Sequence, residues 1–232
     1  MNIERSRSVE HRVAVYAALA DPTRLRVVDV LTAGDAASSE LSVRLGIPSN
    51  LLAHHLRTLE GAGVIERRRS EGDGRRSYWR LAPDAIGSLG SLGSIAGPAP
   101  ATPGRVVFVC TANTARSHLA AALWRAASDI PVTSAGTQPG PRIARGAVAA
   151  AGRHGLDLPE VAPRSLAEIG PEADDLVVTV CDLAHEELAG AGQLHWSTPD
   201  PVAVGTRAAF DRAHDELAAR VRVLAPLLQR AS

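Results

Sequence analysis

Apolar residues recur at helical spacing along the chain up to about residue 62, which predicts a run of α-helices. Asp21 followed by Pro22 is typical of a helix start, because aspartate caps backbone N–H groups and proline fits the first turn. Gly34 is expected to end the helix that starts there. The apolar positions that define four helices are Val9, Val13, Tyr16 and Ala20; Leu25, Val28 and Leu31; Leu41 and Leu45; and Leu52, Leu56 and Leu59.

The third and fourth of these helices are short and are joined by a tight turn. Ser39 and Ser49 are expected to cap them, and Gly46 is expected to end the first before the Ile47–Pro48 turn. This pattern predicts a helix-turn-helix, with the second helix inserted in a DNA groove. The residue types on its outward side suit hydrogen bonds to base edges, and we expect DNA contacts from Ser49, Asn50, His54, His55 and Arg57.

A β-hairpin is predicted next. Residues 64–69 and 75–81 have the composition of two strands, and the Glu71-Gly72-Asp73-Gly74 segment forms the turn between them. Arginines near the tip can reach phosphates or a minor groove, and the candidates are Arg68, Arg75 and Arg76. Alternatively, the same arginines only solvate the hairpin.

The chain is expected to have two domains, because residues 87–104 have the Gly, Ser and Pro composition of a linker. Residues 1–86 then form a winged helix-turn-helix that is mostly α-helical, with the hairpin as its wing. Residues 105–232 alternate apolar strands with helices, which predicts an α/β domain with a central parallel sheet. Its predicted strands cover residues 105–109, 132–137 and 175–182, and its clearest helices cover residues 144–154 and 210–228.

The first strand of the second domain ends in a Cys-x5-Arg-Ser motif, from Cys110 to Ser117, that leads into a helix. Backbone N–H groups of such a loop converge on a tetrahedral oxyanion, and Arg116 supplies a planar cation for the same anion. The positive field favours a Cys110 thiolate, aligned for attack on the bound anion. The residues expected to bind the oxyanion are Thr111, Ala112, Asn113, Thr114, Ala115, Arg116 and Ser117. Asn113 tolerates a left-handed backbone and is expected to brace the loop.

Composition narrows the protein class. A zero net charge and 45% hydrophobic residues indicate a soluble globular protein, and no apolar run is long enough to span a bilayer. The charged start of the chain does not resemble a signal peptide, and two cysteines cannot form a disulfide-rich scaffold. We therefore expect a cytoplasmic protein with reduced thiols and no membrane contact. Residues 1–86 hold 13 arginines and 11 acidic residues, which weakly favours nucleic-acid binding by this half.

Residues 17–82 resemble ArsR-type winged-helix repressors, most clearly at Ala18–Arg26 and His54–Ile65. The resemblance implies a homodimer, formed through the N-terminal domain, on an inverted-repeat operator in double-stranded DNA. Metal sensors of this family carry a Cys-x-Cys pair where this chain has Ser42-Val43-Arg44. Adjacent His54 and His55 point about 100° apart on a helix, which makes a poor chelating pair. No metal site is therefore predicted.

Residues 105–232 resemble the low-molecular-weight tyrosine phosphatase superfamily, and within it the arsenate reductase branch. The segments that carry this likeness are Val178–Asp182 and His195–Pro201, together with Val202 at a position where phosphatases have tyrosine. The resemblance implies that Cys110 attacks arsenate held by the loop and Arg116, that Asp200 acts as general acid, and that Cys181 resolves the adduct as a disulfide.

This chain departs from the reductases at two positions. The third cysteine of the thioredoxin-coupled enzymes is Leu188 here, and the loop position before the arginine, often cysteine, is Ala115. No bound cofactor is expected, only an external reductant of thioredoxin, mycothiol or glutathione type. Either a Cys110–Cys181 disulfide is reduced directly, or a small thiol resolves the adduct.

Three functions remain open from the sequence. In the first, an arsenic-responsive regulator is fused to an arsenate reductase. In the second, the C-terminal domain only senses an oxyanion, arsenate or phosphate-like, or senses cysteine oxidation. In the third, the regulator carries a working tyrosine phosphatase. Two of the catalytic roles have a structural alternative: Cys181 could be a packing residue, and Asp200 could cap a loop. We expect His118 and His195 to be structural.

Overall fold

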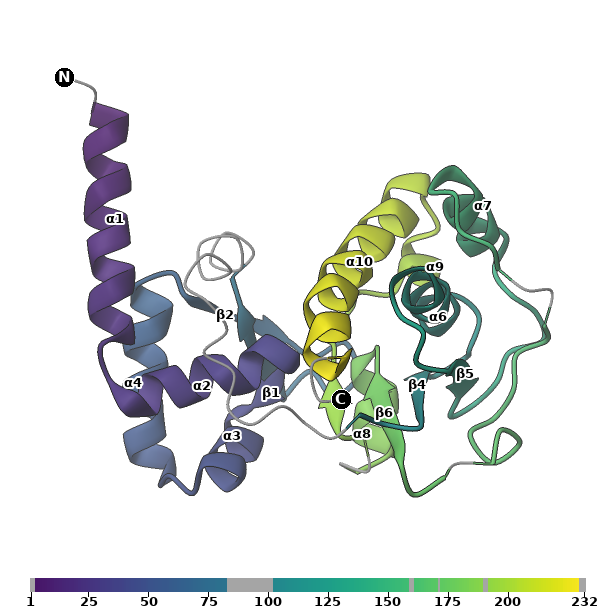
Figure 1. Cartoon of the computed structure of the whole chain (residues 1–232), viewed down its shortest axis with the longest axis horizontal. Helices are drawn as coiled ribbons and strands as arrows, with labels where there is room; N and C mark the ends of the chain where they lie inside the picture. Colours follow the sequence, from purple (N-terminus) through teal and green to yellow (C-terminus); the bar gives the residue numbers. More distant parts are fainter. Residues whose placement is uncertain (1–2, 83–101, 159–160, 171, 190–191, 230–232) are drawn as a thin grey trace. The chain divides into compact units, whose positions relative to one another are not determined.

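The structure is a computed structural model that describes residues 3–82, 102–158, 161–170, 172–189 and 192–229 (Figure 1). The chain divides into two compact units, Met1–Arg69 with Arg75–Gly97, and Ser70–Gly74 with Pro98–Ser232. Up to residue 101, the linker predicted for residues 87–104 lies outside the described residues.

The first unit is a winged helix-turn-helix, as the sequence predicts. A three-stranded antiparallel sheet in the order β1-β3-β2 accompanies its helices. The strands β2 and β3 are the arms of the predicted hairpin. The bounds of the elements are α1 (Ile3–Leu19), α2 (Pro22–Ala33), β1 (Ala36–Ala37), α3 (Ser38–Leu45), α4 (Ser49–Gly61), β2 (Ile65–Arg69) and β3 (Ser77–Leu81).

The helix caps agree with the sequence prediction at one helix and differ at two. Asp21 caps α2, where its Oδ1 accepts a hydrogen bond from the Arg24 N–H at 2.9 Å, as predicted. Neither predicted serine cap forms. The N-cap of α3 is Ala37, and its N–H donates to Glu40 Oε2 at 2.8 Å, so the local bond comes from the glutamate instead of Ser39. Ser49 is the first residue of α4, after an N-cap at Pro48.

The core of the first unit is built on α2, α3, α4 and the hairpin. Fully buried leucines from three helices meet β2 and β3, and the Trp79 indole N–H donates to Ser38 Oγ at 2.9 Å. The inner face of α1 is Val15, Ala18 and Leu19. The face that the apolar spacing selected on α1 is exposed instead, with Val9 at 56%, Val13 at 60% and Tyr16 at 46% exposure.

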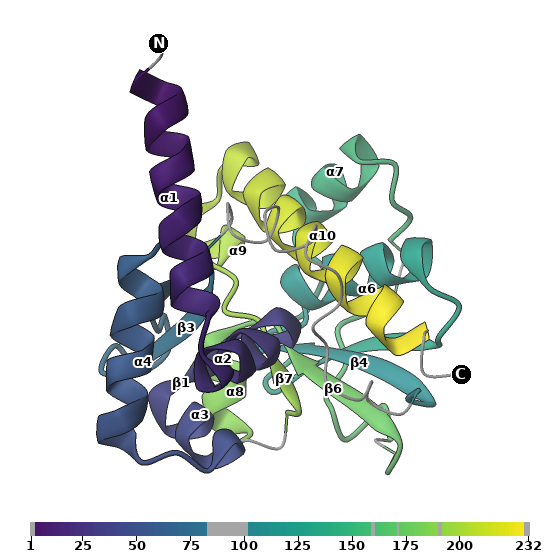
Figure 2. The same cartoon turned by 60° about the vertical axis from the view of Figure 1, so that its left-hand side comes forward.

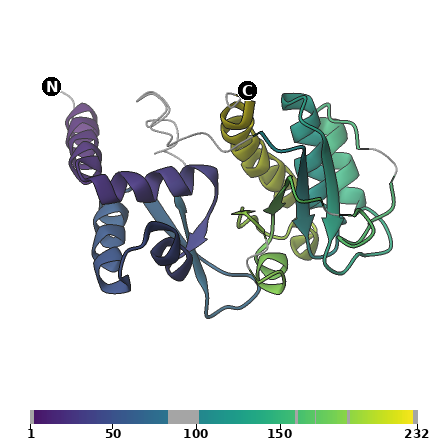
Figure 3. The same cartoon turned by 60° about the horizontal axis from the view of Figure 1, so that its bottom comes forward.

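The second unit is an α/β domain with a four-stranded parallel sheet in the order β5-β4-β6-β7. Figure 3 shows the teal strands β4 and β5 side by side and pointing the same way. The bounds are β4 (Arg105–Cys110), α6 (Arg116–Ala127), β5 (Val132–Gly136), α7 (Arg145–Arg153), β6 (Asp175–Thr179), α8 (Asp182–Glu187), β7 (Leu194–His195), α9 (Pro201–Val204) and α10 (Arg207–Gln229).

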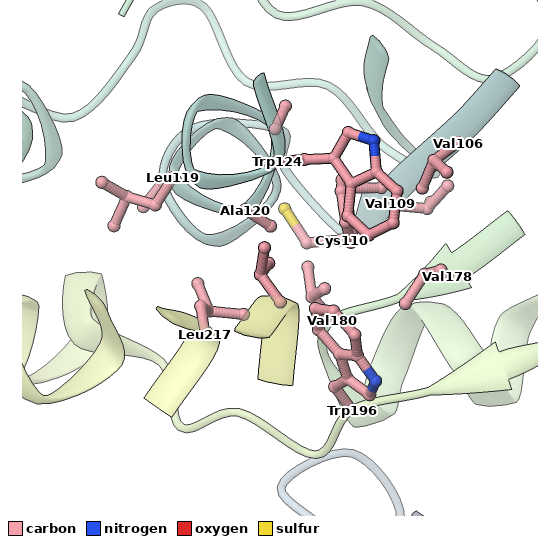
Figure 4. Packing of buried hydrophobic residues seen from close by; sticks show 14 of the residues in the cluster. Val106, Val109, Cys110, Leu119, Ala120, Trp124, Val178, Val180, Trp196 and Leu217 are labelled. Carbon is pink, nitrogen blue, oxygen red and sulfur yellow. The ribbon is translucent and has the colours of Figure 1, made fainter. Parts of the chain in front are cut away.

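Helices α6 and α10 pack together beside this sheet, with α6 against β4 and β5 and α10 against α6 and α7 (Figure 2). Val106, Val109 and Leu119 lie in the core between strand and helix (Figure 4). The Phe108 ring packs against both Trp124 and Trp196, with centroid distances of 6.0 and 5.4 Å.

Three short elements of the second unit were not predicted. The segment 194–201, expected as a loop, begins with β7 and is followed by α9, and α8 starts directly after Cys181. Each has two to six residues, too few for periodicity to reveal. Within the described residues, none of the helices combines the length and apolar character that a membrane span requires.

Candidate active site and nucleic-acid interface

The loop after β4 folds around the sulfur of Cys110. The N–H of Asn113 donates to Cys110 Sγ at 3.2 Å, which curls the chain back on the end of the strand. Asn113 has a φ of 50°, so its predicted left-handed conformation is confirmed. The loop then enters α6 at Arg116, where unpaired helix N–H groups point towards the loop.

The Ser117 hydroxyl lies within hydrogen-bonding distance of the Cys110 sulfur. The side-chain Nδ2 of Asn113 donates to Ser117 Oγ at 2.8 Å, and Ser117 Oγ lies 3.2 Å from Cys110 Sγ. Because the Ser117 oxygen accepts from Asn113, its own hydrogen is available for the sulfur. The Asn113 N–H and the Ser117 hydroxyl can thus both donate a hydrogen bond to the Cys110 sulfur.

The side chain of Asn113 braces the loop, as predicted. It also donates to Ser134 Oγ at 3.1 Å, and its Oδ1 accepts from the Arg164 N–H at 2.9 Å. Gly136 at the end of β5 allows this close approach, because a Cβ there would lie 2.6 Å from the Thr111 carbonyl oxygen. Neither Ser134 nor Gly136 stands out in the sequence.

Arg116 is 9% exposed and is held by the segment that follows β7. Its Nη1 donates to the Thr198 carbonyl at 3.0 Å, and its Nη2 lies 3.4 Å from Asp200 Oδ2. Burial disfavours its charge, but the negative charges of the Cys181 and Cys110 thiolates and of the Asp200 and Glu71 carboxylates together outweigh burial and raise the pKa of Arg116. The guanidinium is therefore a permanent cation at the end of the sheet.

Cys181 lies at the same end of the sheet. Its sulfur is 3.4 Å from Thr111 Oγ1 and is 1% exposed. Burial raises the pKa of the Cys181 thiol, and the nearby Arg116 cation opposes part of this shift. Cys110 and Cys181 follow neighbouring parallel strands, which explains why residues 71 positions apart in the chain meet.

One cleft brings most of the predicted residues together. It is lined by the four candidate catalytic residues Cys110, Arg116, Asp200 and Cys181, and by Thr111, Ala112, Thr114 and Ala115 from the loop. Asn113 and Ser117 do not line it; they contact the sulfur from behind and shape the loop. Asp200 also caps α9 by accepting the Val202 N–H at 2.9 Å, so the predicted alternative of a loop cap coexists with its place in the cleft.

The sequence prediction missed a buried polar cluster beside the cleft. His195 Nε2 lies 3.0 Å from Asp182 Oδ1, and Thr179 Oγ1 lies 3.0 Å from His195 Nδ1 and 3.1 Å from His185 Nδ1. Burial alone would raise the pKa of Asp182, but the hydrogen bonds from His195, the Glu71 N–H and Ser197 together outweigh it, so the pKa is lowered. The sequence signal was the position of Asp182, directly after a candidate catalytic cysteine.

A possible metal-ligand group lies away from the cleft, where His154, His214 and Asp215 each offer one atom within 4.8 Å of the others. The two imidazole rings are stacked, with centroids 3.6 Å apart and an interplanar angle of 15°. The lone pair of an imidazole nitrogen lies in the plane of its ring. Two stacked rings therefore direct their nitrogen lone pairs along parallel planes and not towards one shared ion. The group could hold a metal only after a ring rotates.

The predicted DNA-contacting residues of α4 separate into two sets. Ser49, Asn50, His54 and Arg57 are exposed on one side of the helix. His55 is buried, at 7% exposure, with its Nδ1 3.7 Å from Asp21 Oδ1, so its predicted DNA contact is wrong. The helical turn from His54 carries His55 to the inner face beside Leu56. On the hairpin, Arg75 and Arg76 are exposed and Arg68 is half-buried.

The family model for low molecular weight phosphotyrosine protein phosphatases matches residues 105–232, more than half of the chain. The chain belongs to this family. A second model, for a helix-turn-helix domain, matches residues 19–68. The chain thus joins a helix-turn-helix domain to a domain of the low molecular weight phosphotyrosine protein phosphatase family.

The winged-helix unit is similar to a curated repressor. The transcriptional repressor SdpR of Bacillus subtilis (strain 168) is 34% identical over 55 residues, which is 24% of this chain. The chain spans only 61% of the length of that repressor.

Two solved structures align with the phosphatase-family domain and have different activities. The arsenate reductase of Archaeoglobus fulgidus DSM 4304 is 28% identical, with 52% of this chain and 98% of that chain covered and a TM-score of 0.44. The YwlE arginine phosphatase of Geobacillus stearothermophilus is 25% identical, with 55% and 94% covered and a TM-score of 0.47. These likenesses do not choose between reduction and hydrolysis.

Proposed function

We propose that this protein is a cytoplasmic DNA-binding transcriptional regulator of the arsenic response whose C-terminal domain reduces arsenate with thiols. The observation that carries the proposal is the second thiol: Cys181 lines the same cleft as Cys110 and Arg116. A phosphatase needs one nucleophilic sulfur, whereas reduction of arsenate needs two electrons, which two thiols supply when they form a disulfide.

In the first proposed step, Cys110 is the nucleophile. Its thiolate attacks the arsenic of an arsenate held by the loop N–H groups and Arg116, and an arsenic–oxygen bond breaks. Asp200, 3.4 Å from Arg116, is placed to protonate the departing oxygen, which leaves as water. The product is a Cys110–arsenate thioester in which arsenic is still pentavalent.

The second step uses Cys181. Its thiolate attacks Cys110 Sγ, the sulfur–sulfur bond forms, and the electron pair of the sulfur–arsenic bond stays on arsenic. Arsenite leaves, and the two thiols have been oxidised to a disulfide. An external thiol of thioredoxin, mycothiol or glutathione type then reduces this disulfide, because the sequence has only two cysteines.

The winged helix supports the regulatory half of the proposal. Ser49, Asn50, His54 and Arg57 lie on the exposed side of α4, where they can address base edges of an operator. The exposed apolar side chains of α1 suit burial against a second copy, since a single small module rarely binds DNA with enough specificity. We therefore propose a homodimer, formed through the N-terminal domain, on double-stranded DNA.

A phosphatase is the second candidate, and Asp200 favours it. A carboxylic acid in the cleft of a family built on cysteine attack is what hydrolysis of a phosphate ester requires. Against it stands the cleft wall, where the aliphatic Val202 occupies the position of a phosphatase tyrosine.

Turnover assays on the purified full chain separate these functions. We expect arsenate reduction that depends on added thiol, with loss of activity in both Cys110→Ser and Cys181→Ser. Hydrolysis of an aryl phosphate that survives Cys181→Ser, with no arsenate turnover, would instead make the protein a phosphatase. Activity retained by Cys110→Ser would contradict both candidates.

An operator-binding titration tests the link to DNA. Arsenate, arsenite and an oxidant are each added to the DNA complex of the wild type and of Cys110→Ser. A change in DNA affinity with arsenate in the wild type alone is expected. If neither variant has turnover but arsenate or oxidant still changes the affinity through Cys110, the C-terminal domain is a sensor only.

A further inference from the structure

A buried polar cluster lies at the end of β6, and its member Asp182 also lines the cleft. Its members Thr179, Asp182, His185 and His195 are 0–3% exposed. The rings of His185 and His195 are stacked with centroids 4.1 Å apart. Polar groups this deeply buried are retained only when they bond to one another, so the cluster constrains the segments that carry it.

The hydrogen on His195 Nε2 is set by its partner. Asp182 Oδ1 lies 3.0 Å from this nitrogen, and a carboxylate only accepts hydrogen bonds, so Nε2 must donate. On the other side of the ring, Nδ1 lies 3.0 Å from the Thr179 hydroxyl, whose own strand is fixed in the sheet. The imidazole is thereby held at both nitrogens, and its orientation is fully determined.

The two ends of the Asp182–His195 bond belong to the two segments that supply catalytic groups. Asp182 directly follows Cys181, which caps α8. His195 ends β7, three residues before the Thr198 carbonyl that accepts from Arg116 Nη1 and five before Asp200. Trp196 between them packs on Phe108 of β4. The bond therefore joins the Cys181 turn to the loop that aims Arg116.

We propose that Asp182 is a positioning residue, which through His195 keeps the Thr198–Asp200 loop in register so that Arg116 faces the bound oxyanion. The inference rests on the proposed function and adds a residue to its site. When the carboxylate is removed, a buried N–H of His195 loses its acceptor, and the loop shifts until water or another group supplies one. A shift of about 1 Å in a group that holds the reacting anion is enough to weaken catalysis by about a hundredfold.

The chain offers a matched control at the opposite end of the same strand. Asp175 begins β6, has a side chain 2% exposed, and accepts from Arg105 Nε and Nη2 at 2.8 and 2.6 Å. Asp175→Asn removes a buried charge as Asp182→Ala does, but it lies far along the strand from Cys181. Any effect shared by the two variants reflects stability, and an effect of Asp182→Ala alone reflects the cleft.

The experiment measures how inorganic phosphate protects Cys110 from alkylation in the full chain, a readout that requires no turnover. Asp182→Ala should weaken the apparent phosphate affinity by about tenfold or more, because Arg116 is no longer aimed at the anion. Asp182→Asn keeps an oxygen acceptor for His195 and loses only the acceptor of the Glu71 N–H, which lies 2.8 Å from Asp182 Oδ2, so the affinity should stay within about threefold of the wild type. Asp175→Asn should lower the melting temperature and leave the affinity unchanged.

The outcomes separate this inference from the function it rests on. If phosphate and arsenate never protect the wild type, the oxyanion site itself is wrong. If the wild type is protected and Asp182→Ala behaves as Asp175→Asn does, the positioning role is wrong. If Asp182→Ala does not fold, the same phosphate-protection assay is applied to His195→Gln and His195→Leu. Glutamine retains a donor for Asp182, so His195→Gln should preserve the phosphate affinity that His195→Leu loses. An equal loss of affinity in both variants would overturn the inference.

Discussion

The two thiols of the cleft have different surroundings although they are chemically identical. Cys110 accepts from the Asn113 N–H and faces the Ser117 hydroxyl, so its sulfur is surrounded by donors. Cys181 is enclosed by the protein, and burial raises the pKa of its thiol. The same residue type therefore suits attack on an anion at one position and a delayed, second attack at the other.

The rate of disulfide formation should rise with pH. Because the pKa of Cys181 is raised, its thiolate is the minor form near neutrality, and its fraction grows about tenfold per pH unit below that pKa. Quenched single-turnover reactions with arsenate would measure Cys110–Cys181 disulfide from pH 6 to 9. Cys181→Ser should form none at any pH, and a pH-independent rate in the wild type would contradict the assignment.

His118 should make the second unit sensitive to acid. Burial lowers its pKa from 6.5 to about 4; a hydrogen bond with the Asn113 backbone opposes this shift, and the Arg125 and Arg164 charges add to it. The unfolded chain binds a proton at this residue below pH 6.5 and the folded chain does not, so stability present above pH 6.5 is lost as the pH falls towards 4. The loss is up to about 3 kcal/mol.

Urea unfolding at pH 7 and pH 4.5 measures this effect. His118→Leu should reduce the difference in unfolding free energy between the two pH values, whereas the more exposed His154→Gln should leave it nearly unchanged. Equal pH dependence in the wild type and His118→Leu would show that acid acts elsewhere.

At the scale of elements, long periodic segments were predictable and short ones were not. The four N-terminal helices, the hairpin and the long C-terminal helix follow from apolar spacing and from Gly and Pro positions. β1, β7 and α9 have two to four residues and are fixed by pairing or by a cap, which spacing does not encode. The serine caps failed because backbone geometry and Glu40 decide which group meets the first N–H.

The site was predictable to the extent that its residues lie in one motif or at strand ends. Cys110 to Ser117 is contiguous, and strand ends in a parallel sheet meet at one edge, so the Cys181 location followed. The Asp182–His195 bond and the contact of Arg116 with the Thr198 carbonyl depend on side-chain rotamers and loop course. His55 illustrates the same limit of sequence-based prediction, because a shift of one position along a helix decides whether a side chain faces the DNA groove or the protein core.

The side chain of the α2 N-cap should contribute more to helix stability than the side chain of the first residue of α4. Asp21→Ala removes the bond to the Arg24 N–H and should destabilise α2 by about 1 kcal/mol, whereas Asp21→Asn keeps a capping oxygen. Ser49→Ala should change α4 by less than about 0.5 kcal/mol. Amide exchange in Pro22–Ala33 and Ser49–Gly61 of the full chain measures both. Equal effects of Asp21→Ala and Ser49→Ala would contradict the assigned caps.

At the scale of the whole molecule, α1 carries apolar surface that its own unit leaves uncovered. Val9, Val13 and Tyr16 are about half exposed along one helix, whereas the other exposed large apolar residues of the unit, Val43 and Leu51, lie on two different helices. A stripe of this kind suits association with an identical stripe on a second copy, since two-fold pairing uses one surface twice.

Val13→Glu should dissociate the proposed homodimer. The introduced carboxylate would have to be buried against the partner copy, which disfavours association strongly. Sedimentation of the full chain should give a monomer, with a correspondingly weaker operator complex. Val43→Glu, at an 83% exposed position on α3, should leave the oligomeric state unchanged. A wild type that sediments as a monomer at all concentrations would contradict the proposed homodimer.

The aromatic residues under the cleft give the protein an optical reporter. Trp196 is buried against Phe108 and stands two residues before Thr198, while Trp124 contacts the same ring from α6. A movement of the Thr198–Asp200 loop that extends to Trp196 would change the apolar surroundings of its indole. Its intrinsic fluorescence emission would then shift, so anion loading and thiol oxidation can be followed in real time without an added label.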